Sequence, residues 1–395
     1  MTYDFDIKTD RSGTNSLKWN VSDRELPMWV ADMDFPTAPE VRAAILKRAG
    51  HGIFGYTVIP EEWYDAYIRW WEKRHHFKMN KDWLIFATGV VPAISSAVRK
   101  LTTAGENVLI QTPVYNIFFN SIVNNGRNVM EAPLTYNGKT YAIDWKELEG
   151  KLADPQTTLM LLCNPHNPVG KIWDRETLAK IGELCSRYHV TVISDEIHCD
   201  LTAPACSYIP FASVSDICRR ISVTCVAPTK AFNLAGIQTA AVVVPDENLR
   251  HKMWRALNTD EVAEPNAFAV DAAVAAFTKG GPWLDALQAY IAGNKQLASE
   301  FINQNLQEIK AVFSEATYLM WIDCGNLPGD GEKICRYLRE KTGLYLSEGG
   351  QYGKSGEHFL RMNVACPRSL VEEGLNRLQK GLTAYKNEQG ALCSF

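Results

Sequence analysis

The stretch that decides the fold is Val226-Ala227-Pro228-Thr229-Lys230-Ala231-Phe232-Asn233-Leu234-Ala235-Gly236, which places one lysine directly after an apolar run. Apolar runs of this length form strands that are covered on both faces. The carboxyl end of such a strand is where open α/β sheets bind ligands. A lysine is usually solvated, so the position alone would favour a surface anchor. Thr229 and the small residues of the turn favour instead an amine that forms a Schiff base with an aldehyde.

Further apolar runs alternate with helical patterns along the chain, which is typical of an α/β fold. We expect strands at Leu84–Ala87, Val108–Gln111, Thr158–Cys163, Val190–Ser194, Ile221–Val226 and Thr239–Val244. Leu178, Ile181 and Leu184 repeat at helical spacing between two of them. Residues 48–281 are therefore expected to form one large domain around a mostly parallel sheet.

A second unit is expected at residues 282–395. It would contain a long helix over 282–304, the strands Tyr318–Asp323 and Phe359–Val364, and a final helix from Ser369 to Tyr385. Residues 1–47 are expected to join this smaller domain. A domain built from both chain ends would place the active site in a cleft between two bodies.

Composition excludes several classes of protein. The chain has 395 residues and a net charge of −4, so it shows no basic footprint for nucleic acid or an anionic membrane. No apolar run approaches the ~18 residues of a membrane span, and from the acidic, polar start we expect no secretory signal. The ten cysteines have no Cys-x-x-Cys or zinc-like spacing. We expect a cytoplasmic protein with reduced thiols and no metal.

Two carboxylates end another apolar run, in the segment Val192–His198. An Asp at this place is often a helix N-cap. The functional interpretation is that Asp195 faces a cation such as a pyridinium nitrogen. A carboxylate beside that nitrogen keeps it protonated, and the ring then remains an electron sink.

Two more strand ends carry candidate binding groups. The segment Cys163–Gly170 holds two Asn-Pro pairs, which indicate a rigid loop, either an ordinary tight turn or one whose Asn amide donates to a cofactor oxygen. In Ala87–Ile94 a strand ends at a glycine and a helix begins. Free N–H groups at a helix start bind phosphate well.

Together these four segments resemble the fold-type I pyridoxal-phosphate enzymes, the aspartate aminotransferase superfamily, across almost the whole chain. The stretches Met28–Phe35 and Ser194–Leu201, with the lysine segment, resemble the MalY/PatB group of cystathionine β-lyases, also called cysteine-S-conjugate β-lyases or C–S lyases. The implied fold is α/β, with a large domain around a mostly parallel mixed sheet and a smaller α/β domain built from both termini.

The resemblance implies pyridoxal 5'-phosphate as cofactor and assigns roles around its ring. Lys230 would bind the cofactor and then act as general base, and Asp195 would pair with the pyridine nitrogen. Asn167 would bind the ring hydroxyl oxygen. Tyr115, otherwise an ordinary core tyrosine, would stack on the ring. His198 would also lie at the cofactor, where aminotransferases commonly have a tyrosine.

The resemblance further implies a phosphate site and a substrate site. The phosphate would be held by Gly89, Val90, Val91 and Thr229, and by Tyr56 of the partner subunit in a homodimer. Many relatives have Arg or Lys eight residues after the lysine, whereas this chain has Gln238, so the phosphate would depend more on backbone amides. Arg361, otherwise part of a structural salt bridge, would bind the substrate carboxylate. Ala31, Tyr115 and Asn167 would complete the substrate site.

The implied reaction is α,β-elimination from L-cystathionine or a related cysteine conjugate, which yields pyruvate, ammonia and a thiol. One alternative is a class I/II aminotransferase that acts on an L-amino acid and a 2-oxo acid with the same lysine and cofactor. A second alternative is a regulatory protein that binds a transcription factor. Nucleotide-binding glycine motifs are absent from the sequence. The sequence does not identify the leaving group of the substrate.

Overall fold

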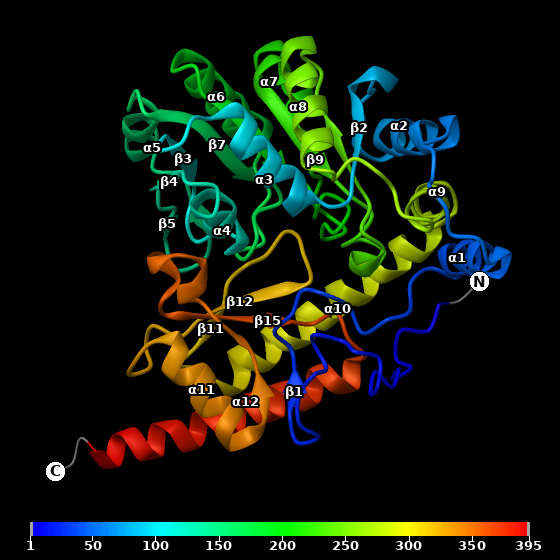
Figure 1. Cartoon of the computed structure of the whole chain (residues 1–395). Coiled ribbons are helices and arrows are strands. Elements are labelled where there is room, and N and C mark those ends of the chain that lie inside the picture. The colour runs from blue at the N-terminus through cyan, green and yellow to red at the C-terminus, as the bar shows by residue number, and fades with distance from the viewer. Residues whose placement is uncertain (1–2, 393–395) are drawn as a thin grey trace.

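The computed structural model describes residues 3–392, with side chains to residue 389. It is built around a seven-stranded sheet (Figure 1). The strand order is β2-β10-β9-β8-β7-β3-β4. Five neighbouring strands run parallel, and β10 is antiparallel to both of its neighbours. The bounds are β2 Leu84–Ala87, β3 Asn107–Ile110, β4 Asn128–Glu131, β7 Thr157–Cys163, β8 Thr191–Asp195, β9 Ser222–Val226 and β10 Ala240–Val243.

Helices cover both faces of this sheet. Leu159 and Leu161 of β7 pack in the cluster of α3, α4 and α8, whereas Met160 and Leu162 pack in the cluster of α5, α6 and α7. This alternation follows from the period of two along a strand. The bounds are α3 Val90–Leu101, α4 Ile117–Val123, α5 Trp145–Leu152, α6 Arg175–Arg187, α7 Asp216–Ile221 and α8 Glu247–Thr259.

A four-stranded antiparallel sheet forms a second layer, with the order β11-β12-β15-β14. Helices α11 and α12 pack together beside it. The N-terminal strand β1 pairs in parallel with β13, so the N-terminal segment joins the C-terminal part of the chain here. The bounds are β1 Leu26–Pro27, β11 Lys310–Ala311, β12 Leu319–Asp323, β13 Leu344–Tyr345, β14 Ser347–Glu348, β15 Phe359–Asn363, α11 Gly331–Thr342 and α12 Arg368–Leu392; the hairpin of β5 Thr135–Tyr136 and β6 Tyr141–Ala142 lies apart.

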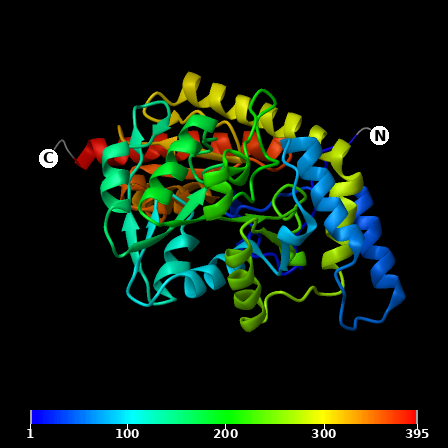
Figure 2. The ribbon, with the colours of Figure 1, turned by 90° about the horizontal axis from the view of Figure 1, so that it is seen from above.

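The long helix α10 (Gly281–Asn305) extends along both layers (Figures 1 and 2). Its first half packs with α2 (Glu61–His75) and α9 (Ala269–Lys279), and its second half packs with α11 and α12. Helix α1 (Pro39–His51) packs against α9. The boundary expected at residue 47 falls inside α1, and the division into domains stays a prediction.

The segment before α1 is held by a buried ionic cluster. Asp34 accepts hydrogen bonds from Arg11 at 2.8 Å, Lys18 at 2.7 Å and the Trp19 indole at 2.8 Å. Asp32 also pairs with Arg11, at 3.0 Å. The buried charges therefore have partners, which offsets their desolvation. Arg11 and Lys18 also donate to the backbone oxygens of Met33 and Asp32, so this cluster fixes residues 32–34, directly after Ala31 of the functional site.

The α/β architecture predicted from the sequence is confirmed, and each expected strand is present with ends shifted by at most one residue. The final helix was expected to end at Tyr385, but it continues to Leu392. The edge strand β4 was not expected, because Asn128–Glu131 has polar ends and is only half-buried. No helix among the described residues is long and apolar enough to cross a membrane.

The central helix α10 should contribute strongly to stability. Leu287 on this helix is fully buried, so Leu287→Ala should lower the free energy of unfolding by about 2–5 kcal/mol, because it leaves a cavity. Leu46→Ala on α1 is the control, since Leu46 is 60% exposed and should change stability by about 0.5 kcal/mol or less. Denaturant unfolding followed by tryptophan fluorescence checks both, and equal losses would contradict the central position of α10.

Candidate active site

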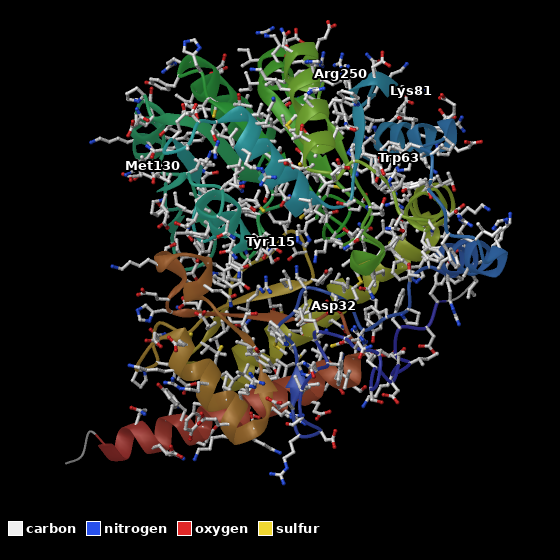
Figure 3. The ribbon with its side chains drawn as sticks, in the orientation of Figure 1. Asp32, Trp63, Lys81, Tyr115, Met130 and Arg250 are labelled. Carbon is white, nitrogen blue, oxygen red and sulfur yellow. The ribbon has the colours of Figure 1, made fainter. Side chains whose placement is uncertain are left out.

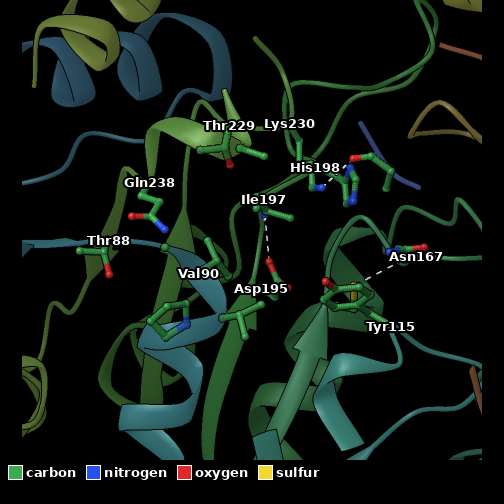
Figure 4. Close-up of a pocket in the computed structure, with 16 residues that line it drawn as sticks. Thr88, Val90, Tyr115, Asn167, Asp195, Ile197, His198, Thr229, Lys230 and Gln238 are labelled. Atoms are coloured by element: carbon green, nitrogen blue, oxygen red, sulfur yellow. Dashed lines mark hydrogen bonds between the residues drawn. The ribbon is translucent and has the colours of Figure 1, made fainter. Parts of the chain in front are cut away.

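A cavity of about 250 Å³ lies at the carboxyl ends of β7, β8 and β9 (Figure 4). In Figure 3, Tyr115 and Asp32 lie near the boundary between the large sheet and the smaller layer. Ten of the residues predicted from the sequence line the cavity. These are Ala31, Gly89, Val90, Val91, Tyr115, Asn167, Asp195, His198, Thr229 and Lys230. Gln238, eight residues after Lys230, lines it as well.

Asp195 is the last residue of β8 and forms the floor of the cavity. The register places it beside Cys163 on β7 and Cys225 on β9. Its Oδ1 accepts one hydrogen bond, from the Ile197 N–H at 3.1 Å. Burial raises the pKa of Asp195 to about 6, against the opposing effects of that hydrogen bond and of Lys230. The helix N-cap interpretation is wrong, because the chain continues into turns after β8 and not into a helix.

Glu196, the second carboxylate of this segment, is fully buried and binds elsewhere. It accepts hydrogen bonds from the Ser194 hydroxyl at 2.7 Å, the Phe211 N–H at 2.9 Å and the Tyr208 hydroxyl. These contacts anchor the turn that follows Asp195. Of the two adjacent carboxylates, only Asp195 is available to a ligand in the cavity.

Lys230 lies in the turn after β9, and its amine points into the cavity (Figure 4). Nζ donates to the Ala31 carbonyl oxygen at 2.7 Å. Burial, together with the nearby Arg361, lowers the pKa of Lys230 to about 8, against the opposing effects of Asp32 and Asp195. The surface-anchor interpretation is therefore wrong, and about a tenth of this amine is unprotonated at pH 7, far more than for an ordinary lysine.

Arg361 lies on β15, behind the residues that line the cavity, and is 5% exposed. Its guanidinium donates to the Asn167 side-chain oxygen at 3.2 Å and to the Trp29 carbonyl at 2.9 Å, and its Nε has no partner among the described residues. No carboxylate among those residues forms an ion pair with Arg361, which contradicts the salt-bridge interpretation. A buried cation without a counterion favours binding of an anion.

The opposite end of the cavity is formed by the start of α3. Gly89 is the N-cap of this helix and offers no side chain for capping, so the first backbone N–H groups lack helical acceptors. Thr229 and Gln238 lie at the same end of the cavity. Free N–H groups at a helix start, together with hydroxyl and amide groups, can bind a phosphate.

Tyr115 and His198 are both neutral near pH 7. Burial raises the pKa of Tyr115 to about 12, and burial lowers the pKa of His198 to about 3. The Nδ1 atom of His198 is buried and has no hydrogen-bond partner, and its ring packs edge-on to Tyr318. The sequence gives no signal for Tyr318, because it directly precedes β12 and belongs to no motif.

Tyr56 is the one predicted cofactor residue that the single chain leaves away from the cavity. It lies between α1 and α2, it is fully exposed, and it does not line the cavity. Its predicted role requires a partner subunit, so that role stays a prediction.

Comparison with known proteins identifies the family. A family model described as aminotransferase class I and II matches residues 26–378. The chain belongs to this family. It is 42% identical to cystathionine beta-lyase PatB of Bacillus subtilis, over 96% of this chain and 100% of that protein. It is 33% identical to protein MalY of Escherichia coli, over 97% of this chain and 100% of that protein.

Solved structures give the same result. Cystalysin from Treponema denticola, which contains a pyridoxal 5'-phosphate cofactor, has a TM-score of 0.94 at 33% identity, over 97% of this chain and 100% of that chain. The PLP-bound C-S lyase from Staphylococcus hominis has a TM-score of 0.89 at 30% identity, over 96% of this chain and 99% of that chain. The fold-type I fold and the resemblance to the MalY/PatB group are therefore confirmed.

The loop that carries Asn167 should respond to acid. His166 is fully buried, its Nε2 lies 2.8 Å from the Pro113 carbonyl oxygen, and burial lowers its pKa to about 4. In the unfolded chain, the His166 imidazole takes up a proton near pH 6.5, whereas in the folded chain it does so only near pH 4. The free energy of unfolding should therefore fall by about 1.4 kcal/mol per pH unit as the pH drops from 6.5 toward 4. Unfolding of His166→Gln between pH 7 and 4.5 should show a shallower loss than that of the wild type, whereas equal slopes would contradict the shift.

Proposed function

We propose that this protein is a pyridoxal-phosphate-dependent C–S β-lyase that cleaves a cysteine thioether, such as L-cystathionine, to pyruvate, ammonia and a thiol. The observation that carries the proposal is the buried Arg361 without a carboxylate partner, in the same site as an amine of lowered pKa. Arg361 would bind the carboxylate of an amino acid, and the amine would remove its Cα proton. The names of PatB and of the C-S lyase structure favour elimination over transamination.

The residues of the cavity fit the cofactor group by group. The start of α3 and Thr229 provide donors for a phosphate, and the buried Asp195, with one hydrogen bond, provides a partner for a pyridinium. The Lys230 amine suits an aldehyde, and the Tyr115 ring lies in the same cavity. When bound, pyridoxal 5'-phosphate supplies an aldehyde that condenses with amines and a ring that withdraws electrons.

The chain's own groups then account for binding and proton transfer. Arg361 binds the substrate carboxylate with two donors and thereby orients the Cα proton. Lys230, with a pKa near 8, removes this proton as general base. Asp195 keeps a negative charge opposite the pyridinium. Loss of the proton lets the Cβ–S bond break, and the electron pair leaves with the sulfur as a thiolate.

We further propose a homodimer whose subunits share their active sites. Ile53, Phe54, Tyr56 and Val58 are 67%, 56%, 102% and 80% exposed in the single chain. A contiguous group of exposed apolar side chains favours a protein interface. Tyr56 would then reach the phosphate bound by the partner subunit.

A cytoplasmic location is part of the proposal. The cysteines among the described residues form no disulfide, and all but Cys206 are buried. Reduced thiols of this kind are typical of a reducing compartment. Cys393, the remaining cysteine, lies outside the described residues.

The role of Lys230 can be tested with Lys230→Ala. Release of pyruvate from L-cystathionine, without added 2-oxo acid, should fall at least about 100-fold, because the general base is lost. Lys252→Ala on the exposed side of α8 is the control and should keep wild-type activity. A Lys230→Ala protein with wild-type activity would refute the proposal, and a wild type that turns over only with a 2-oxo acid would be an aminotransferase.

Subunit complementation tests the shared active site. Lys230→Ala and Tyr56→Ala subunits should each form dimers of low activity. Mixed dimers contain one site with both residues intact, so refolding the two variants together should restore up to about a quarter of wild-type activity. No gain on mixing, although each variant alone is impaired, would contradict a contribution of Tyr56 across the interface.

A further inference from the structure

One backbone carbonyl in the site receives two side-chain donors. The Ala31 oxygen accepts from the Lys230 amine at 2.7 Å and from the Tyr318 hydroxyl at 2.8 Å. A carbonyl oxygen has two lone pairs, so these donors occupy both. Tyr318 is fully buried and stands outside the cavity lining. No direct hydrogen bond joins Tyr318 to Lys230 among the described residues, and the Ala31 oxygen is the acceptor that they share.

The direction of the Ala31 carbonyl is fixed from both sides. The buried Asn363 on β15 donates from one side-chain nitrogen to the carbonyl oxygens of Val30 and Asp32, each at 2.6 Å. The next carbonyl back, that of Trp29, accepts from Arg361 at 2.9 Å. Hydrogen bonds fix the peptide units before and after Ala31, so the direction of the Ala31 oxygen toward Lys230 is fixed as well.

We propose that Tyr318 is a positioning residue for Lys230, which it orients through the Ala31 carbonyl. The Tyr318 hydroxyl occupies one of the two lone pairs of the Ala31 oxygen. The Lys230 amine can then bind only to the other lone pair, which fixes the direction of its hydrogen bond. This inference rests on the proposed function, in which the amine of Lys230 must stay close to the Cα proton of the substrate. Orientation of this kind contributes to the rate of proton transfer.

The hydroxyl also influences the charge of the lysine. The ionisable groups that face the amine are Asp32, Asp195, Arg361 and the neutral His198. The Tyr318 O–H competes with the lysine for electron density on the Ala31 oxygen. Without the Tyr318 donor, the Ala31 oxygen would accept a stronger hydrogen bond from the charged ammonium form of Lys230. The pKa of Lys230 should therefore rise above its present value of about 8.

The test compares Tyr318→Phe with Tyr385→Phe. Both changes remove one oxygen and keep the ring, and both hydroxyls are buried donors to a backbone carbonyl, since Tyr385 donates to Pro328 at 2.6 Å. The first readout is the pH dependence of Lys230 acylation in the full chain after cofactor removal, followed by peptide mass spectrometry. Tyr318→Phe should move the midpoint upward by about half a pH unit or more, and Tyr385→Phe should not move it.

The second readout is turnover of L-cystathionine by the cofactor-loaded enzyme. In Tyr318→Phe, kcat should fall about 10–100-fold while KM changes little, because the base is misplaced and the carboxylate site is intact. An unchanged acylation midpoint overturns the inference, even if the variant is less stable. A wild type that releases no pyruvate would refute the proposed function instead, and the acylation midpoint would still decide the effect of Tyr318 on Lys230.

Discussion

The parallel register of β7, β8 and β9 determines where the site forms. Cys163, Asp195 and Cys225 lie side by side across the sheet, so the three segments that follow them leave the sheet at one level. Asn167, His198 and Lys230 belong to these segments and meet at one cavity as a result. A one-residue slip in any strand would turn its side chains to the opposite face and remove a group from the site.

The site lowers the stability of the fold, because it buries ionisable groups without a full set of hydrogen-bonding or charged partners. Burial raises the pKa of Asp195 and lowers those of Lys230 and His198, which means that the protein disfavours the charged form of each. Arg361 is buried without a carboxylate partner among the described residues. A ligand that brings a pyridinium and a carboxylate supplies the missing partners, and such binding stabilises the fold. Without a ligand, the extensive core around α10 holds these buried groups in place.

Much of the fold and of the site could be predicted from the sequence, because the signals are local. Strands such as Leu84–Ala87 are apolar runs between turns, and Asp195 and Lys230 follow such runs directly. Tyr318 and Asn363 could not be predicted, since they contact residues 30–32 from almost 300 positions or more away in the chain. The packing of α1 against α9 has no local signal either. Tyr56 was found only through the resemblance to a family.

We expect the Lys230 amine, and no other, to bind the aldehyde of the cofactor. Lys295 is the alternative to exclude, because burial lowers its pKa to about 7 as well; its amine is already bound to Ser314 at 2.8 Å and to Ala316 at 2.9 Å, beside a cavity of only about 20 Å³. Borohydride reduction of the loaded protein, followed by peptide mass mapping, tests this choice. We expect one added mass, on the peptide that contains Lys230. An added mass on the peptide that contains Lys295, or no added mass on any peptide, would contradict this assignment.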